Sequence, residues 1–183
     1  MTLQTRHLTY EEYLKSPEIK QRYEIVDGKM IMPPSPNLEH QTILGQLHFL
    51  MYQFLNEHNL GRVWVAPLDV LVQREPLRTR QPDLLFVSSE RASILGQIIE
   101  GGPDLVVEIL SPSNTRAAMD EKLSDYARLG VRECWIVAPE GRTIEALELS
   151  EGKWQRLEIY GLGDTLRSQV LEGLELPVAE IFG

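Results

Sequence analysis

The chain has 183 residues, 43% of them hydrophobic and 25% charged, as expected of one ordinary globular domain over residues 1–183. Its net charge of −9 argues against a protein that coats nucleic acid non-specifically, because phosphates attract Lys and Arg. The sequence holds no apolar span of ~20 residues, no basic-then-apolar leader and only one cysteine, Cys134, so we expect a cytoplasmic protein without membrane contact, disulfide or zinc–cysteine site.

The first third of the chain predicts a short helix, a hairpin and a long helix. Residues 9–12, Thr-Tyr-Glu-Glu, have capping-box spacing, so a short helix should run from there to Ser16. Two apolar runs, 23–26 and 29–32, flank Asp27-Gly28, a favoured two-residue hairpin turn. From about residue 37 to 59 apolar residues recur at intervals of three and four, which predicts a helix.

Three apolar runs follow, and they predict strands over 62–72, 80–87 and 103–110. A helix should then begin within 111–114 and end at Gly130, ahead of another short strand. A strand, a helix and a strand in succession favour a parallel pair, whereas the short earlier links favour a meander. The sheet should therefore be mixed.

The last part of the chain predicts a β-hairpin from runs 143–149 and 153–160 around Ser150-Glu151-Gly152. Its residues Trp154, Leu157, Ile159 and Tyr160 are candidates either to cover a sheet edge or to pair with a second copy of the chain. Residues 174–178 predict a poor helix or an edge strand. The expected fold is thus α/β, a mixed β-sheet flanked by helices, with an N-terminal hairpin and a C-terminal β-hairpin.

Each of the three middle runs carries an acid among apolar residues: Asp69, Asp83 and Glu108. A single acid on a strand is usually a solvated outward residue, and that interpretation is favoured for Asp69. For Asp83 and Glu108 together a shared site is favoured, because neighbouring acids at strand centres repel one another. A divalent cation relieves that repulsion, since Mg²⁺ is typically held by one or two carboxylates and waters.

The helix after the Glu108 strand can supply a cation to such a site. Lys122 and Tyr126 are four residues apart and therefore lie on one helix face. The link 111–114 is short enough for this helix to pack back beside the strand and present its lysine. The alternative for Lys122 is a solvated lysine on the outside of the helix.

Several motifs together resemble the Uma-type family of restriction-endonuclease-like proteins. They are Arg-Gln-Pro-Asp at 80–83, the run 103–113, Lys122, Tyr126, Gly130-Val131 and Trp135-Ile136-Val137, with residues 23–28 and 36–40 also fitting. The resemblance covers about residues 8–182. It places the chain in the PD-(D/E)xK nuclease superfamily, and so implies a restriction-endonuclease-like core and metal-dependent hydrolysis of phosphodiesters.

Position by position, the resemblance makes Asp83 the motif aspartate and Glu108 the second acid, both ligands of Mg²⁺ or Mn²⁺. The backbone carbonyl of Ile109 would complete the metal site. The sequence departs from the motif at Leu110, where the family pattern has a lysine. Lys122 on the following helix is the natural replacement, so Asp83, Glu108 and Lys122 are the expected catalytic residues.

Further residues are expected around this site. Glu24, His40 and Tyr126 would border it, although for His40 a polar role in the first turn of a helix is equally open. Four arginines are candidates for contacts with the nucleic-acid backbone: Arg74, Arg78, Arg80 and Arg116.

The expected function is that of a divalent-metal-dependent endonuclease, with DNA as the expected substrate and a homodimer as the expected assembly. The alternative is a catalytically silent nucleic-acid-binding or protein-interaction module that keeps the nuclease fold, which the apolar Leu110 and the acidic surface favour. Paired carboxylates also serve glycoside hydrolysis, but a lysine beside two acids fits phosphate better.

Overall fold

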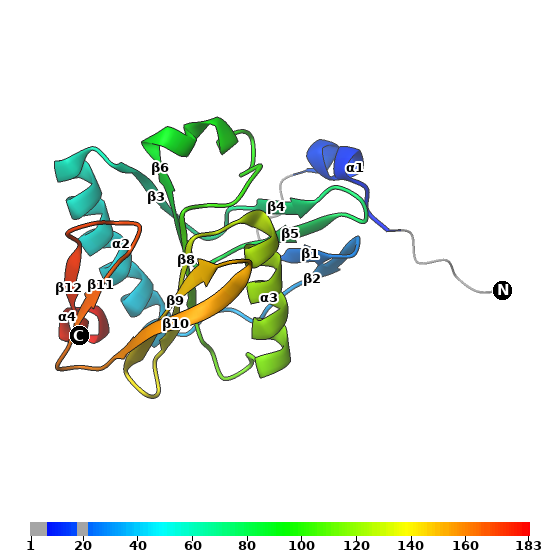
Figure 1. Cartoon of the computed structure of the whole chain (residues 1–183). Helices are drawn as coiled ribbons and strands as arrows, with labels where there is room; N and C mark the ends of the chain where they lie inside the picture. The colour runs from blue at the N-terminus through cyan, green and yellow to red at the C-terminus, as the bar shows by residue number, and fades with distance from the viewer. Residues whose placement is uncertain (1–6, 18–21) are drawn as a thin grey trace.

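A computed structural model describes residues 7–17 and 22–183 (Figure 1). Its central element is a six-stranded mixed sheet in the order β10-β9-β8-β7-β6-β3. The strands are β3 (Gly61–Val65), β6 (Leu84–Ser88), β7 (Leu105–Ile109), β8 (Glu133–Ala138), β9 (Thr143–Ser150) and β10 (Lys153–Tyr160). Only the β7–β8 pair is parallel among these neighbours, and helix α3 (Arg116–Leu129) connects its two strands, as the sequence predicts.

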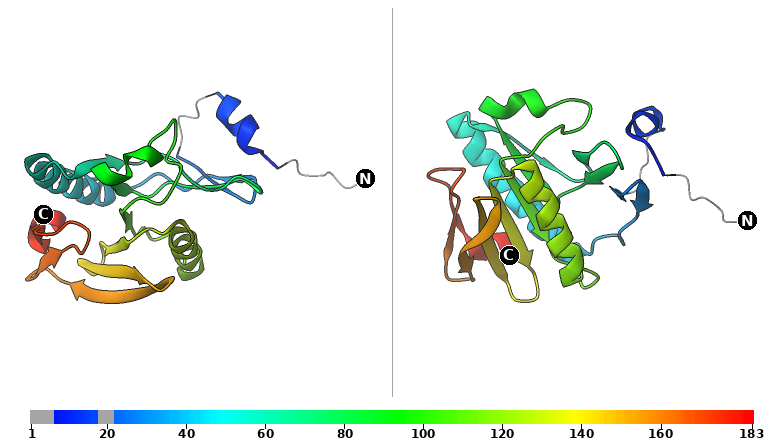
Figure 2. Two further views of the ribbon diagram at one scale, coloured as in Figure 1. Left: turned by 45° about the horizontal axis from the view of Figure 1, so that its top comes forward. Right: turned by 45° about the vertical axis from the view of Figure 1, so that its right-hand side comes forward.

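The two faces of this sheet are covered by different helices, as both views of Figure 2 make visible. Helix α2 (Leu38–His58) and the short C-terminal helix α4 (Val178–Phe182) pack on the face that carries Phe86, Val107 and Trp135. Helix α3 packs on the other face, where its Tyr126 meets Val106. Because side chains alternate along a strand, β7 contributes to both apolar layers and is buried along its whole length.

A second, four-stranded sheet in the order β2-β1-β5-β4 lies beside the first (Figure 1). Its strands are β1 (Glu24–Val26), β2 (Lys29–Ile31), β4 (Val70–Gln73) and β5 (Arg78–Arg80). The hairpin β1–β2 forms at Asp27-Gly28 as predicted, and both turn residues have positive φ, 51° and 75°. Positive φ at both positions is the requirement of a type I′ turn, which matches the twist of the flanking strands.

Two of the predicted long strands are each divided by a proline. The run 62–72 becomes β3 and β4, which belong to different sheets, and Pro67 lies in the link between them. The run 80–87 is divided in the same way, with Pro82 between β5 and β6. Proline lacks the N–H that a central ladder needs, so each strand ends there. Asp69 and Asp83 therefore lie in links ahead of strands, not at strand centres as predicted.

Most other predicted elements are confirmed. Helix α1 (Tyr10–Lys15) has a complete capping box between Thr9 and Glu12. Helix α3 begins later than predicted, because Thr115 caps it, and it ends at Gly130 with φ of 72°. The tail forms both of the predicted structures, since β12 (Glu175–Pro177) pairs with β11 (Thr165–Arg167) and α4 follows. The 3₁₀ helix η1 (Ser89–Ile94) was not predicted.

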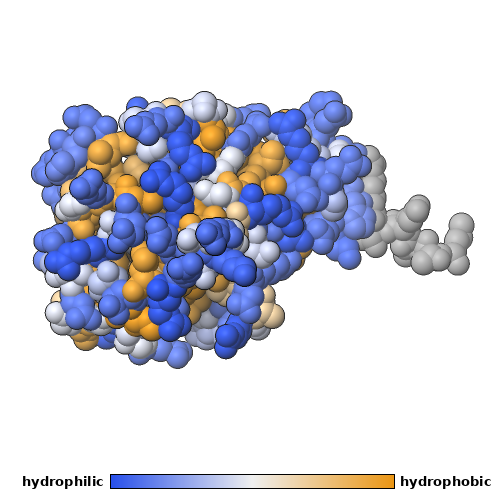
Figure 3. Space-filling view, viewed as in Figure 1, coloured by the Kyte–Doolittle hydropathy of each residue, from blue (hydrophilic) through white to orange (hydrophobic). Residues whose placement is uncertain are grey.

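On the face shown in Figure 3, hydrophobic residues are interspersed among hydrophilic ones. Within the described part of the chain, no helix combines the length and the hydropathy needed to cross a bilayer. The expectation of one domain over the whole chain stays a prediction.

Glu133 connects the C-terminal segment to the central sheet through hydrogen bonds. This buried carboxylate accepts hydrogen bonds from the Trp135 indole at 2.6 Å, from the Ser168 hydroxyl at 2.7 Å and from the backbone N–H groups of Gln169 and Val170. We predict that Glu133→Ala lowers the free energy of unfolding by about 3 kcal/mol, because four donors lose one charged acceptor. Urea unfolding measures the loss, and exposed Glu140→Ala should change stability little. An equal effect of both variants would contradict this role of Glu133.

Candidate active site

Asp83 lies directly before β6, where the proline-containing link brings it to the end of β7. Its Oδ2 accepts a hydrogen bond from the backbone N–H of Ile109 at 2.7 Å. Its Oδ1 lies 2.5 Å from the Arg22 guanidinium and 3.4 Å from His40 Nε2. Burial alone would raise the pKa of this carboxyl, but the hydrogen bond from His40 and the charge of Arg22 outweigh it and hold the pKa below its ordinary value.

Glu108 lies inside β7, on the face that α3 covers, and only 3% of it is exposed. Lys122 Nζ lies 2.9 and 3.1 Å from its two carboxylate oxygens, and the Tyr126 hydroxyl donates a hydrogen bond to Oε1. Burial raises the pKa of Glu108 above its ordinary value, and the nearby charges of Asp83 and Glu24 add to the rise, which Lys122 only partly opposes. The site thus holds one carboxyl that favours ionisation and one that resists it.

Glu24 brings the second sheet to the same place. From β1 its Oε1 lies 2.9 Å from Lys122 Nζ, and its Oε2 lies 2.9 Å from the Arg80 guanidinium. Burial would raise the pKa of Glu24, but the charges of Lys122 and Arg80 lower it below the ordinary value. Burial likewise opposes the charge of Lys122, yet Glu108 and Glu24 raise its pKa above the ordinary value, so this ammonium stays protonated.

The predicted border residues all contact the predicted acids, since Glu24 meets Lys122, His40 meets Asp83, and Tyr126 meets Glu108. His40 is positioned by the start of α2, where its backbone N–H bonds to the Asn37 cap. Its buried Nδ1 has no hydrogen-bond partner among the described residues.

The sequence did not predict the contact between Arg22 and Asp83. Arg22 stands two residues before Glu24, and residues at that spacing in an extended segment point to the same face. The spacing of Arg22 and Glu24 was the one feature of the sequence that could have predicted this contact. Arg22 Nη2 also donates to the backbone carbonyl of Gln81 at 2.6 Å, so one guanidinium holds both ends of the link that carries Asp83.

The predicted nucleic-acid contacts separate into two groups. Arg78 and Arg80 form internal ion pairs with Asp125 and Glu121, and the Arg80 side chain is only 4% exposed. Arg80 therefore balances buried acids in this structure and does not present a free guanidinium to a phosphate. Arg74 and Arg116 have exposed side chains, at 64% and 95%, and Arg74 pairs with Glu100.

The side chains of this site supply only some of the ligands that a hard divalent cation requires. The described residues contain no group of three or more His, Cys, Asp or Glu side chains placed to hold a metal ion. Two carboxylates at adjoining strand ends are nevertheless the usual protein share of a Mg²⁺ site, in which waters supply other ligands. The raised pKa of Glu108 indicates that its anionic form lacks full compensation. The Arg22 guanidinium lies against Asp83 Oδ1, where it would compete with such an ion.

Comparison with known proteins gave one family and a structural likeness. A model of the Uma2 family, described as "Putative restriction endonuclease", matches residues 10–179. The fold is similar to a crystal structure described as "a putative nuclease belonging to DUF820" from Anabaena variabilis, with a TM-score of 0.80 and 19% sequence identity over 96% of this chain and 97% of that one. At this identity the likeness shows the fold alone. No curated protein matched the sequence.

The lowered pKa of Glu24 predicts a change in the acid limb of the stability curve. Because the folded pKa lies below the unfolded one, the unfolded chain binds more protons between the two values, and stability increases with pH there. Glu24→Gln should lower the free energy of unfolding by about 2 kcal/mol at pH 7, because Lys122 and Arg80 lose a charged acceptor. The difference should disappear as pH falls through the folded pKa.

Chemical denaturation of both proteins from pH 7 to pH 3 provides the measurement. Exposed Glu39→Gln, in the first turn of α2, serves as the matched control. A constant difference between wild type and Glu24→Gln at every pH would show that the charge of Glu24 contributes nothing.

Proposed function

Because the chain belongs to the Uma2 family, as the resemblance in its motifs indicated, we propose that it is a divalent-metal-dependent nuclease that hydrolyses phosphodiester bonds of DNA. The observation that carries the proposal is the convergence of two buried carboxylates and one buried ammonium from separate segments. Asp83, Glu108 and Lys122 come from a link, a strand and a helix. Asp83 accepts a hydrogen bond from the N–H of Ile109, the residue after Glu108, and Lys122 pairs with Glu108. Burying such charges is costly, which favours a functional reason for their presence.

In this proposal Asp83, Glu108 and the backbone carbonyl of Ile109 would hold Mg²⁺ or Mn²⁺. A divalent ion bound there would neutralise phosphate charge and lower the pKa of a water molecule. Arg22 would have to leave Asp83 Oδ1 when the ion binds, and its 23% exposed side chain has a route to solvent.

The chain's own residues would orient and stabilise the reacting groups. Lys122 is protonated and rigidly held by Glu24 and Glu108, so it can donate to the negative charge that grows on phosphate oxygens. Tyr126 fixes the Glu108 carboxylate by donating to Oε1, and the Ile109 N–H fixes Asp83. Preorganised donors of this kind lose little energy to reorganisation during the reaction.

The second candidate is a catalytically silent module that keeps the fold and binds nucleic acid or a protein. It is supported by Leu110 at the usual lysine position and by the ion pairs themselves. Arg22 pairs with Asp83 and Lys122 pairs with Glu108, so each acid has a cation without any metal. A site of paired charges can persist without catalysis.

Binding of the substrate and assembly complete the proposal. The exposed Arg74 and Arg116 would contact the DNA backbone, with Arg78 held close by at 11% exposure. A homodimer in the cytoplasm would suit cleavage of both strands. Strand β10 lies at an edge of the central sheet and exposes 45% of Ile159, so it would be the pairing surface.

We predict that Glu108→Ala and Lys122→Ala each lower the rate of DNA cleavage by about 100-fold or more, because each removes a group that acts on the reacting phosphate. Digestion of plasmid DNA with Mg²⁺ and Mn²⁺ provides the measurement. Glu108→Gln, which keeps the size of the side chain, separates loss of charge from loss of folding. Lys153→Ala removes an exposed lysine and should leave the rate unchanged. Cleavage that survives both alanine substitutions would refute the assignment.

Metal binding separates the nuclease from the silent module. An ion that binds only the folded protein should raise its free energy of unfolding by about 2.7 kcal/mol at a hundred times the dissociation constant. We predict this gain with Mn²⁺ for wild type, a larger gain for Arg22→Ala because Asp83 loses its competing cation, and none for Asp83→Asn. Asp120→Asn, an exposed aspartate on α3, is the control. Absence of any gain in wild type would support the silent module.

A further inference from the structure

An exposed apolar segment, residues 30–38, leads from β2 to the start of α2. Its sequence, Met-Ile-Met-Pro-Pro-Ser-Pro-Asn-Leu, contains no charged residue, although 25% of the whole chain is charged. All of its residues are exposed, including 51% of Ile31 and 54% of Met32. A run of exposed apolar residues adds nothing to the core, so in a native protein it usually marks an interaction site.

The first end of segment 30–38 lies on the active-site face of the β1–β2 hairpin. The strand register places Ile31 directly opposite Glu24, and directly opposite residues of an antiparallel pair point to the same face. Glu24 uses that face to contact Lys122 at 2.9 Å. Opposite residues have Cα atoms about 5 Å apart, so Ile31 borders the candidate active site.

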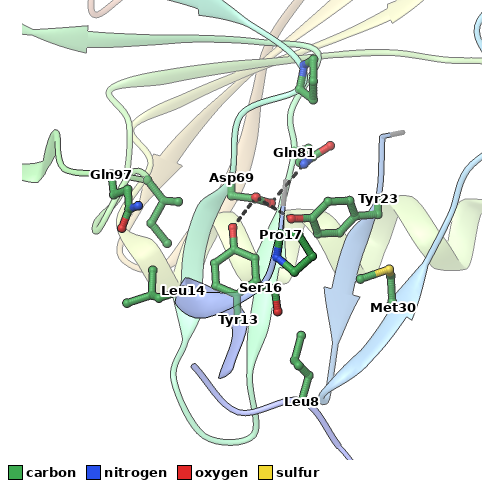
Figure 4. A pocket seen from close by; sticks show the side chains of 12 residues that line it. Leu8, Tyr13, Leu14, Ser16, Pro17, Tyr23, Met30, Asp69, Gln81 and Gln97 are labelled. Carbon is green, nitrogen blue, oxygen red and sulfur yellow. Dashed lines mark hydrogen bonds between the residues drawn. The ribbon is translucent and has the colours of Figure 1, made fainter. Parts of the chain in front are cut away.

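Met30 shows where the other face of the hairpin leads. It pairs with Ile25 and lines a cavity together with Tyr13 and Tyr23 (Figure 4). Because side chains alternate along a strand, Ile31 points away from that cavity. Ile31 and Met32 also belong to none of the apolar clusters that the described residues form. Their apolar surface therefore contributes little to folding and is available for binding.

The second end of segment 30–38 also reaches the site. His40 follows two residues after Leu38, and its Nε2 lies 3.4 Å from Asp83 Oδ1. The segment thus runs from beside one acid of the site, Glu24, to beside another, Asp83. A nucleic-acid strand extends well beyond the one phosphate that would occupy this site, so its neighbouring nucleotides come within reach of the segment. This continuity with the candidate site favours the substrate as the occupant.

The chemistry of segment 30–38 fits bases and not phosphates. Phosphates require Lys or Arg, whereas Ile, Met, Pro and Leu are side chains that proteins insert between base steps. Bases within an intact duplex are stacked, and the cost of unstacking is smallest where a base is already unpaired. The net charge of −9 adds to this selectivity, because a duplex carries more phosphate charge per unit length than a single strand.

We propose that segment 30–38 contacts unpaired bases next to the scissile phosphate, so that the substrate is DNA with locally separated strands, such as a bubble, a gap or a frayed end. The proposal rests on the proposed nuclease function and adds a substrate class to it. Ile31 and Met32 pack against the unpaired bases, and exposed Lys29 beside them pairs with a flanking phosphate. The prolines of the segment restrict its backbone, so it loses little conformational freedom on binding.

The test measures binding of the full chain to a short labelled duplex and to the same duplex with a central stretch of mismatched thymines. Fluorescence polarisation gives both affinities at one ionic strength, with Ca²⁺ present so that the carboxylates keep a divalent ion. Electrophoresis afterwards verifies that the DNA is intact. Wild type should bind the mismatched duplex about tenfold more tightly than the paired one. The double variant Ile31→Ser, Met32→Ser should bind both with equal affinity, because serine cannot replace the apolar contact.

A matched control and a second measurement keep the result interpretable. Leu162→Ser removes an apolar residue of similar exposure, 44%, beyond β10, and should retain the tenfold ratio. Urea unfolding verifies that each variant is folded. The proposal is overturned if wild type binds neither duplex, if it binds both equally, or if the double variant retains the ratio. A double variant that retains the ratio but turns a dimer into a monomer in gel filtration would assign segment 30–38 to a second copy of the chain.

Cleavage assays with Mg²⁺ on the same two duplexes distinguish this proposal from the proposed function. Cleavage by wild type with equal binding of both duplexes refutes the role of segment 30–38 alone. The tenfold ratio without cleavage supports the segment and refutes the nuclease alone.

Discussion

The ammonium group of Lys122, held between Glu24 and Glu108, is the interaction on which the rest of the site depends. It joins the four-stranded sheet, the six-stranded sheet and α3 at one point. A carboxylate buried as deeply as Glu108 is very costly unless a cation and hydrogen-bond donors accompany it. Helix α3 must therefore pack in the register that delivers both Lys122 and Tyr126. The late start of α3 at its Thr115 cap, after a linker that leaves β7, permits that register.

The buried carboxylates near Lys122 need cationic partners, and this need explains the positions of Arg78 and Arg80. Arg80 lies between Glu24 and Asp125, and Arg78 bridges Asp125, Asp27 and Glu121, so a chain of alternating charges runs outward from Lys122 to the surface of α3. In an acidic protein these cations are few, and those near the site are used internally. Arg22 differs from them, because it pairs with Asp83 and its side chain is 23% exposed.

Local patterns predicted most of the local structure, and the missed contacts around the site are non-local. The capping box at Thr9, the Asp27-Gly28 turn and the spacing of Lys122 and Tyr126 depend on neighbours within a few residues, and each has the predicted geometry. The pairing of Ile25 with Thr79 joins segments far apart in the chain, and no periodicity reports such a contact. For this reason the second sheet, the contact of Arg22 with Asp83 and the burial of Arg80 were not foreseen. Pro67 and Pro82 can each end a strand. Because apolar residues lie on both sides of each proline, one continuous strand was predicted in each case.

The break at Pro82 has a consequence for function. Had residues 80–87 continued as one strand, Gln81 and Asp83 would have alternated regularly with their neighbours within a single ladder, and the second sheet would have had no strand β5. The proline ends the ladder and leaves a short link, in which Gln81 donates to Asp69 and Asp83 accepts from the N–H of Ile109. Arg22 and Tyr23, which stand just before β1, divide in the same way, because Arg22 contacts Asp83 and Tyr23 contacts Asp69. One residue of each segment thus contacts the candidate active site, and the other contacts Asp69. Arg22 also donates to the Gln81 carbonyl, so one guanidinium contacts both the acid of the candidate site and the residue that bonds to Asp69.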